Sequence, residues 1–370
     1  MHRLTLFMTH QCNFDCRYCP QTHEDVYMSE ETARRALDLL RLEILACEDS
    51  SKNTERQKVQ VSFYGGEPLL ARKKIEQIVS YANETIGGIP GVHINYEITT
   101  NGLLLDQEFL DFAKRNKILL ALSHDGEAQD LTRVDRGGNK TRARIDEKLK
   151  MLLRTFPETV VMMTIHPDHA DTFLESIRFF HEAGVRTVSF VPAHGERVAW
   201  TDEKFSVFSR ELEKAKDLYV RWNQGHGIFR LVPFENKIRN YIHEKSADNR
   251  MCHFSCGKTM VDVDGRYYPC SHFIGREGFC TGSVEEGKDV EAINSLEEKR
   301  IEPDSCMNCA LRFRCRHTCA CSNHGHTGDM ASVSAMQCEY EKLIIRLADE
   351  AAAELIKETN PRFVERMYKD

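Results

Sequence analysis

The stretch Cys12-Asn13-Phe14-Asp15-Cys16-Arg17-Tyr18-Cys19 holds three cysteines, separated by three and then two residues, directly after the first predicted strand. Three thiolates can hold three irons of a [4Fe-4S] cluster, and the fourth iron then stays open to another ligand. The main alternative is zinc, but three cysteines with no nearby fourth ligand make a poor structural zinc site. We therefore expect a cluster with one open iron and chemistry at that iron.

The overall composition is that of a soluble globular enzyme. The chain has 370 residues, of which 41% are hydrophobic, and no apolar run approaches the roughly 20 residues that a membrane span needs. Residues 1–5 enter a short strand without the apolar stretch of a signal peptide. A formal charge of −7 gives no support for nucleic-acid binding. We expect a cytoplasmic protein with no membrane and no nucleic-acid partner.

The cysteines are numerous and unevenly placed. The chain has fourteen, and the absence of a secretory signal favours metal or redox chemistry over disulfides. Three lie at 12–19, one is Cys47, and ten lie between Cys252 and Cys338. This distribution predicts separate metal centres at the two ends of the chain.

Residues 1–195 repeat a short strand followed by an amphipathic helix, which predicts a parallel α/β sheet with helices outside. The predicted strands are Leu4–Met8, Val59–Phe63, Ile94–Thr99, Ile118–Leu122, Val160–Ile165 and Thr187–Val191. In the first helix, Ser29 is the expected N-cap and an apolar stripe follows at helical spacing. The stripe consists of Ala33, Ala36, Leu37, Leu40 and Ile44.

Each chemically suggestive motif of this half directly follows a predicted strand. They are the cysteine loop, Gly65-Gly66-Glu67-Pro68, Thr100-Asn101-Gly102 and Ser123-His124-Asp125-Gly126. In a β/α barrel the carboxyl ends of the strands carry the active site, and a doubly wound open sheet would also bring them to one edge. Two glycines let the backbone approach a ligand closely, and a carboxylate beside them can accept hydrogen bonds from an ammonium group. For Asp125-Gly126 a turn or capping role is favoured over contact with a substrate.

The rest of the chain divides into a helical bridge at 196–250, a cysteine-rich segment at 251–340 and a terminal helix at 341–370. The cysteine-rich segment is poor in periodicity, as in a small fold held by metal. Its Cys-x2-Cys pair at Cys306 and Cys309 would by itself also suit a zinc ribbon. Cys280 and Cys321 fall outside the pattern, and for both a free thiol is favoured over a stray ligand. Cys47 is interpreted as a packing or incidental residue.

The cysteine loop, with the aromatic Tyr18 one position before Cys19, resembles the cluster loop of the radical S-adenosylmethionine (SAM) enzymes. In that family the open iron binds SAM, which is cleaved to a 5′-deoxyadenosyl radical that takes hydrogen from a substrate. The resemblance implies a partial (β/α)6 TIM-like barrel over residues 1–195. The residues it places against SAM are Gly65, Gly66, Glu67, Asn101, Ser123 and Arg133. Arg136 competes with Arg133 for the carboxylate of SAM.

The cysteines of 251–340 are similar to those of the SPASM domain, which binds two auxiliary [4Fe-4S] clusters. Together with Cys12, Cys16 and Cys19, this resemblance implies three clusters. Its first auxiliary set is Cys252, Cys256, Cys270 and Cys319, and its second is Cys306, Cys309, Cys315 and Cys338. The thiolate count is complete without the histidines of this segment, so no metal is assigned to them.

One position departs from the anaerobic sulfatase maturases, whose cysteine layout this chain resembles. There an aspartate, taken to be the catalytic base, follows the cysteine equivalent to Cys270. Here Ser271 stands in its place, and a serine is too weakly basic to replace it. No catalytic residue is assigned.

We therefore expect a radical SAM oxidoreductase that modifies a ribosomally synthesised precursor peptide, forming a thioether or carbon–carbon crosslink. Only eleven residues precede Cys12, so the leader of that peptide would be held by this chain or by a separate protein. The expected electron donor is a reductase such as flavodoxin or ferredoxin. The alternatives are a sulfatase-type formylglycine maturase, a peptide epimerase and, in another class, a non-catalytic iron–sulfur or zinc protein.

Overall fold

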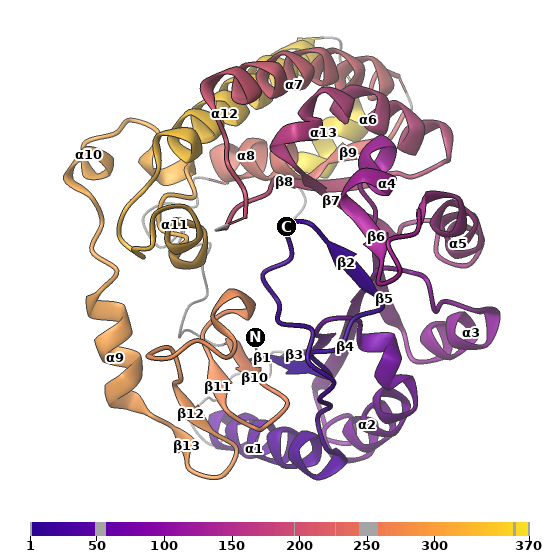
Figure 1. Cartoon of the computed structure of the whole chain (residues 1–370), viewed down its shortest axis with the longest axis vertical. Helices are drawn as coiled ribbons and strands as arrows, with labels where there is room; N and C mark the ends of the chain where they lie inside the picture. The colour runs from indigo at the N-terminus through magenta and orange to yellow at the C-terminus, as the bar shows by residue number, and fades with distance from the viewer. Residues whose placement is uncertain are drawn as a thin grey trace. The chain divides into compact units, whose positions relative to one another are not determined.

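The computed structural model describes residues 2–48, 57–195, 197–225, 227–243, 258–357 and 360–368. Two compact units are built from alternating parts of the chain. Unit 1 comprises Met1–Phe14, Pro20–Ala121 and His253–Lys299, and unit 2 comprises Asp15–Cys19, Leu122–Cys252 and Arg300–Asp370. Figure 1 shows the elements along the chain.

The sheet of unit 1 is mostly parallel. Its strands lie in the order β11 (Tyr267–Tyr268), β10 (Lys258–Val261), β1 (His2–Phe7), β3 (Gln57–Tyr64), β4 (Val92–Thr100) and β5 (Ile118–Ser123), and the last two residues of β5 are in unit 2. β1 pairs in parallel with both β10 and β3, and β3 with β4, while β10 and β11 are antiparallel. A hairpin follows, β12 (Gly282–Ser283) with β13 (Gly287–Lys288). The cysteine-rich segment thus supplies strands to the sheet that begins with β1.

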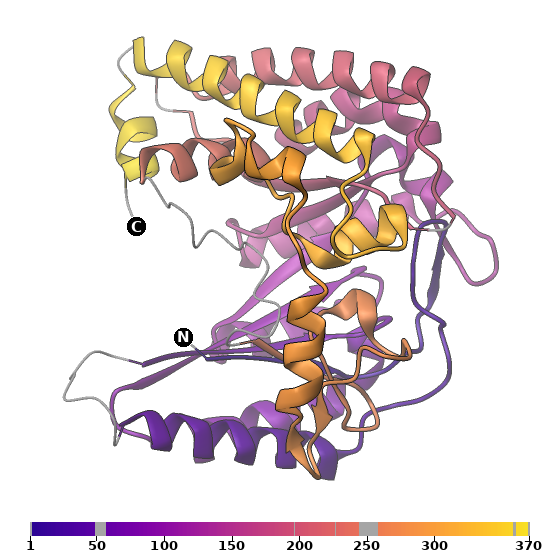
Figure 2. The same ribbon diagram turned by 90° about the vertical axis from the view of Figure 1, so that its left-hand side faces the viewer.

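Helices cover one face of this sheet. They are α1 (Glu30–Glu48), α2 (Arg72–Thr85) and α3 (Gln107–Arg115), and the unit also contains α9 (Val290–Glu298) and the 3-10 turns η1 (Pro68–Ala71) and η4 (Ser271–Phe273). The predicted cap of α1 is confirmed, because Thr32 N donates to Ser29 Oγ at 2.9 Å. The predicted apolar stripe of α1 is buried, and Figure 2 shows this helix running along the strands.

Unit 2 continues the alternation with β7 (Val160–Ile165), β8 (Thr187–Pro192) and β9 (Arg230–Leu231), which are parallel neighbours. The short strand β6 (Arg133–Asp135) pairs with β2 (Phe14–Cys16). The helices of this unit are α4 (Gln129–Thr132), α5 (Arg142–Thr155), α6 (Phe173–Glu182), α7 (Asp202–Trp222), α8 (Val232–Ile242), α10 (Asp304–Met307), α11 (Ala320–Thr327), α12 (Ala335–Lys357) and α13 (Pro361–Tyr368). Its described residues also form the 3-10 turns η2 (Gly126–Ala128), η3 (Pro167–Thr172) and η5 (Arg312–Arg314).

The longest helices of unit 2 pack against each other. α7 and α12 lie side by side in Figure 1 and in Figure 2. Lys216 on α7 and Glu354 on α12 form an ion pair at 3.1 Å. The terminal helix predicted from residue 341 begins at Ala335, so it also carries Cys338. In the part of the chain that the structure describes, every helix is too short or too polar to cross a membrane.

All six predicted strands are present, as β1, β3, β4, β5, β7 and β8. The predicted motifs therefore do follow strand ends within each unit. The predicted domain boundaries at 195, 250 and 340 stay predictions.

Candidate active site

The two glycines after β3 allow a close approach to the backbone just before Cys12. A Cβ atom at Gly65 would lie 2.3 Å from the carbonyl oxygen of Thr9, and one at Gly66 would lie 2.3 Å from that of Gln11. The φ angle of Gly65 is +143°, in the region that favours glycine. Gly66 N donates to Thr9 O and Glu67 N donates to Gln11 O, both at 2.9 Å. Any larger residue at 65 or 66 would displace the start of the cysteine loop.

Glu67 ties this turn to the end of β4. Its side chain is 1% exposed. Oε1 accepts hydrogen bonds from Leu69 N at 3.0 Å and Thr100 Oγ1 at 2.8 Å, and Oε2 accepts from Asn101 N at 2.7 Å. Burial raises the pKa of Glu67 to about 7, although these three hydrogen bonds act to lower it. The carboxylate thus holds two loops together, and its predicted contact with the amino group of SAM stays a prediction.

Cys12 lies among hydrogen-bond donors. Its side chain is 7% exposed, and its Sγ accepts from Phe14 N at 3.4 Å and from Asn101 Nδ2 at 3.9 Å. Asn101 Nδ2 also lies 2.6 Å from Asn13 Oδ1. Donors of this kind stabilise a thiolate, the form that binds metal.

In unit 2, Cys16 lies beside a guanidinium group. Arg133 Nη1 is 4.0 Å from Cys16 Sγ, and both side chains are more than 90% buried. Burial by itself lowers the pKa of Arg133, but the negative charge of Asp125 raises it well above the ordinary value. Arg136, its rival for the carboxylate of SAM, has an exposed side chain. Cys19 follows in a turn in which its N–H donates to Cys16 O at 3.0 Å.

Asp125 is the centre of a network that sequence reasoning missed. Its side chain is fully buried, and Oδ2 lies 3.0 Å from Arg133 Nε, 2.5 Å from Tyr18 Oη and 2.7 Å from Thr132 Oγ1. Oδ1 accepts from Thr164 N at 2.9 Å. Asp125 therefore connects the cysteine loop, through Tyr18, to Arg133. Burial raises the pKa of Tyr18 well above its ordinary value, so its hydroxyl stays a donor.

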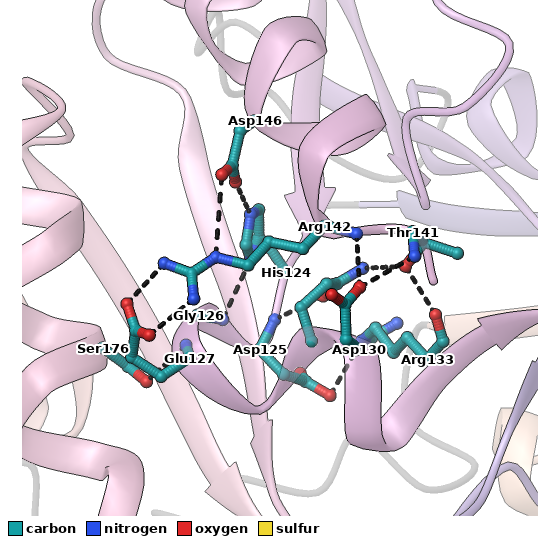
Figure 3. Close-up of polar contacts among 11 residues, drawn as sticks. His124, Asp125, Gly126, Glu127, Asp130, Arg133, Thr141, Arg142, Asp146 and Ser176 are labelled. Atoms are coloured by element: carbon teal, nitrogen blue, oxygen red, sulfur yellow. Dashed lines mark hydrogen bonds and ion pairs between the residues drawn. The ribbon is translucent and has the colours of Figure 1, made fainter. Parts of the chain in front are cut away.

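Figure 3 shows how the surrounding residues hold this network in place. Thr141 Oγ1 donates to Arg133 O at 2.6 Å. Asp130 Oδ1 accepts from Thr141 N at 2.9 Å and from Arg142 N at 2.7 Å, so it binds the start of α5. The backbone of Arg133 is thereby fixed as well as its side chain.

Both ring nitrogens of His124 have hydrogen-bond partners within the protein. It is fully buried, its Nε2 lies 2.8 Å from Asp146 Oδ1, and its Nδ1 accepts from Gly126 N at 2.9 Å. The turn role favoured for Asp125-Gly126 is confirmed, because Ala128 N donates to Asp125 O at 3.3 Å. The imidazole of His124 supports the same turn. Ser123, directly before His124, ends β5 with a half-buried side chain. An Asp-Gly pair is typical of a turn. The sequence therefore held no separate sign that the side chain of Asp125 also contacts Tyr18 and Arg133.

The thiol of Cys306 lies close enough to those of Cys309, Cys315 and Cys338 to interact with them electrostatically. Burial raises the pKa of Cys306, and the charges of Cys338, Glu302 and Cys309 raise it further. Burial raises the pKa of Cys315 to about 12, with a further contribution from Cys306. A metal would remove the proton that such a thiol otherwise keeps. All four positions lie in unit 2.

The loop that carries Cys315 is held by a buried ion pair. Lys237 Nζ and Glu341 Oε2 are 2.5 Å apart. Lys237 Nζ also donates to Arg314 O at 2.6 Å, and Arg316 N donates to Glu341 Oε2 at 2.8 Å. The residues on both sides of Cys315 are thus fixed by α8 and α12.

The other predicted auxiliary set is described only in part. Cys252 and Cys256 lie outside the described residues. Cys270 precedes η4 in unit 1, and Cys319 in unit 2 has its Sγ 3.6 Å from that of Cys321. Among the described residues, no three His, Cys, Asp or Glu side chains converge on one metal-ion position. A four-iron cluster is larger than one ion, so its thiolates need not converge in this way.

Comparison with known proteins identifies the domain. Residues 6–180 match the Radical SAM superfamily. The chain is 22% identical over 362 residues to the cysteine-type anaerobic sulfatase-maturating enzyme of Clostridium novyi, covering 91% of this chain and 93% of that protein. It is also 22% identical over 366 residues to the radical SAM cyclopropyl synthase TigE of Paramaledivibacter caminithermalis, covering 93% and 73%.

Solved structures share the fold. The structure of anSMEcpe with bound AdoMet and the Kp18Cys peptide has a TM-score of 0.75 at 18% identity, covering 95% of this chain and 99% of that one. Streptococcus suis SuiB bound to precursor peptide SuiA has a TM-score of 0.63 at 16% identity, covering 90% and 75%. The expected fold class, a radical SAM α/β fold with a mostly parallel sheet, is confirmed. This chain therefore carries a radical SAM domain at residues 6–180 and is an enzyme, and the domain implies a [4Fe-4S] cluster and SAM as cofactors.

Proposed function

We propose that this enzyme uses SAM and three [4Fe-4S] clusters to modify a ribosomally synthesised precursor peptide, forming a thioether or carbon–carbon crosslink. The observation that carries the choice of substrate is Ser271, which stands where the sulfatase maturases resembled by this chain have an aspartate. A hydroxyl is too weak a base for the role of that aspartate. SuiB, which shares the fold, has been solved with a precursor peptide bound.

In this proposal Cys12, Cys16 and Cys19 hold the first cluster. The surroundings of two of them fit, since Cys12 accepts N–H donors and Cys16 lies beside Arg133. Such donors and a positive charge favour the thiolate form. When bound, the cofactors supply a 5′-deoxyadenosyl radical that takes one hydrogen from the peptide, and an auxiliary cluster that accepts the electron left when a second hydrogen leaves as a proton.

The auxiliary clusters use the two cysteine sets expected from the SPASM resemblance. Cys306, Cys309, Cys315 and Cys338 hold one, which fits the electrostatic influence between Cys306 and each of the other three. Cys252, Cys256, Cys270 and Cys319 hold the other. Full ligation by thiolates leaves these clusters an electron-transfer or structural role.

The side chains around the first cluster orient SAM. Arg133 binds its carboxylate, with the guanidinium held by Asp125 at 3.0 Å. Gly65 and Gly66 let its amino group approach the backbone, and Glu67 holds their turn against Asn101. Asn101 and Ser123 contact the ribose and carboxylate. The leader of the peptide is held by this chain or by a separate protein, and flavodoxin or ferredoxin supplies electrons.

The test is co-expression with a neighbouring precursor peptide followed by tandem mass spectrometry. A crosslink makes the product lighter than the substrate by two hydrogens. An epimerase would instead give a product whose mass is unchanged in ordinary water. The same product made in heavy water would carry deuterium. Anaerobically reconstituted protein should carry about twelve irons, from three four-iron clusters, and stoichiometric zinc without iron–sulfur absorbance would contradict the cofactor assignment.

A sulfatase-type maturase is the second candidate, supported by the match over 91% of this chain to a cysteine-type enzyme of that kind. Its product would show the loss of sulfur from a cysteine. The mass of the product therefore separates the two functions.

A further inference from the structure

Two thiols at the start of α11 lie close together in unit 2. Cys319 is the residue directly before this helix, and Cys321 lies in its first turn. Their Sγ atoms are 3.6 Å apart, and the two residues are not joined in a disulfide. A disulfide bond is about 2.05 Å long, so the two sulfur atoms need to approach each other by about 1.5 Å to form one.

A buried asparagine fixes the backbone that carries both thiols. Asn323 is 1% exposed, and its N–H donates to Cys319 O at 2.9 Å. Asn323 Nδ2 donates to His317 O at 2.8 Å and to Met330 O at 3.0 Å, and Asn323 Oδ1 accepts from Gln337 Nε2 of α12 at 3.0 Å. None of these four hydrogen bonds involves a thiol, so they hold the two sulfur atoms near each other without a bound cluster.

Both cysteines are within reach of a small oxidant. Each residue is half-buried rather than enclosed, so a molecule of the size of hydrogen peroxide can approach its sulfur. The guanidinium of Arg316 interacts electrostatically with both thiols. A positive charge beside a thiol makes its sulfur more reactive. A peroxide that oxidises Cys319 therefore does so with the second thiol 3.6 Å away.

The neighbouring thiol decides what becomes of an oxidised Cys319. The proposed function makes Cys319 a cluster ligand and gives Cys321 no role. One oxidation step converts a thiol to a sulfenic acid, and further steps give sulfinic and sulfonic acids that thiol reductants do not reverse. A sulfenic acid beside a second thiol instead condenses with it to a disulfide, which is reversible. Cys321 is placed to stop the oxidation of Cys319 at the reversible stage.

We propose that Cys319 and Cys321 form a reversible disulfide while the chain lacks its clusters, and that this bond protects Cys319 as a cluster ligand. The oxidant is a peroxide. The sulfur of Cys319 takes one oxygen from hydrogen peroxide, which gives a sulfenic acid and a first water. The sulfur of Cys321 then forms the S–S bond and releases that oxygen as a second water. Two thiols thus lose two hydrogens and two electrons, and one peroxide is reduced to two waters.

The disulfide and its protective value depend on different premises. The bond itself needs the two thiols and a peroxide. Its protective value rests on the proposed function, because it requires Cys319 to be a ligand of an auxiliary cluster.

The test follows the mass of one peptide from the full-length chain. Trypsin cleaves after Arg316 and Asp-N cleaves before Asp329, which releases residues 317–328 with Cys319 and Cys321. Cluster-free protein is exposed to hydrogen peroxide, its remaining thiols are alkylated, and both proteases are applied. We expect this peptide to carry no alkyl group and to be two hydrogens lighter than the dithiol form. Dithiothreitol added before alkylation should return it to the doubly alkylated form.

Two variants test the protection. Cys321→Ser removes the second thiol, and Cys280→Ser is the matched control because Cys280 is also half-buried and outside the assigned ligands. Sulfinic and sulfonic acids of Cys319 should be about tenfold more abundant in Cys321→Ser than in the wild type, because no neighbouring thiol captures the sulfenic acid. After reduction and anaerobic reconstitution, peroxide-treated Cys321→Ser should hold about four fewer irons than the wild type, the content of one cluster. Cys280→Ser should match the wild type in both measurements.

Three results would overturn the proposal. They are two alkyl groups on the wild-type peptide after peroxide, a disulfide from Cys319 to a different cysteine, and equal overoxidation of Cys319 in the wild type and in Cys321→Ser. The first two are measured on the wild type, so they decide the outcome even if the variant does not fold.

Failure of this proposal can be told apart from failure of the proposed function. Protein that has not met peroxide is reconstituted anaerobically, and its iron is measured. If it holds about twelve irons and no bond forms between Cys319 and Cys321 in the cluster-free chain, the disulfide assignment is wrong and the cluster assignment stands. If the bond forms but the untreated protein does not take up these irons, the disulfide stands and the proposed function is wrong.

Discussion

Each unit contains a buried carboxylate, and the hydrogen-bond partners of the two carboxylates differ. Glu67 in unit 1 accepts hydrogen bonds from two backbone N–H groups and one hydroxyl group. Asp125 in unit 2 accepts from two hydroxyl groups and one backbone N–H group, and also lies against the guanidinium of Arg133. The hydrogen-bond donors of Glu67 are neutral, so they offset only part of the free-energy cost of burying its charged form. Asp125 lies beside the full positive charge of Arg133. The comparison teaches that equal burial does not mean equal sensitivity to pH or to mutation.

Asp125→Ala should have the largest effect on the stability of the protein. It leaves the buried charge of Arg133 without its partner, and breaking a buried pair in this way costs about 3–5 kcal/mol. The free energy of unfolding, from urea denaturation, should fall by that amount, and SAM affinity should fall with it. Asp171→Ala, at an exposed position of the same unit, should stay within about 0.5 kcal/mol of the wild type. Equal effects of the two variants would refute the hub role of Asp125.

The pH dependence of stability should distinguish Glu67. Its pKa is raised from 4.5 to about 7, so the protonated form is favoured in the folded state. This stabilising contribution is complete below the unfolded pKa and is lost as the pH rises through about 7. At about 1.4 kcal/mol per pKa unit, the wild type should lose roughly 3 kcal/mol relative to Glu67→Gln between pH 4 and pH 8. Urea denaturation of both proteins across this range measures the difference, and a constant difference would contradict the prediction.

Tyr18→Phe should have a smaller effect, because it removes one donor from Asp125 and leaves Arg133 in place. A hydrogen bond to a charged group contributes about 1.5–3 kcal/mol. The free energy of unfolding should decrease by that amount, and SAM should bind more weakly because Tyr18 connects the cysteine loop to Asp125. Tyr368→Phe, at an exposed position, is the control. If stability and SAM affinity are both unchanged in Tyr18→Phe, the hydrogen bond of Tyr18 to Asp125 does not couple the cysteine loop to this network.

Asp146→Asn should have the smallest effect. It weakens the contact of Asp146 with His124 at 2.8 Å, a hydrogen bond that contributes about 0.5–1.5 kcal/mol. Since His124 supports the turn rather than the ligand, SAM affinity should not change. Titration of SAM into this variant and into Asp125→Ala would sharpen the comparison, and a loss of affinity in Asp146→Asn would place His124 in the binding site.

Local sequence determined the parts of this protein that depend on near neighbours in the chain. Period-two and helical spacing predicted all six strands of residues 1–195, and Ser29 was identified as the cap of α1. Such patterns can be read because a strand or helix buries one face at a fixed spacing. The spacing of Cys12, Cys16 and Cys19 likewise lies within eight residues, and the Radical SAM match covers that segment.

Only the tertiary structure decided which distant residues meet. Asp125 was expected to form a turn, yet it accepts hydrogen bonds from Tyr18, 107 positions earlier, and Thr164, 39 positions later. Arg3 lies beside Lys258 because β10 pairs with β1 across most of the chain. Neither contact has a periodic signature, since pairing between distant segments follows from packing and burial of the whole sheet rather than from local propensity.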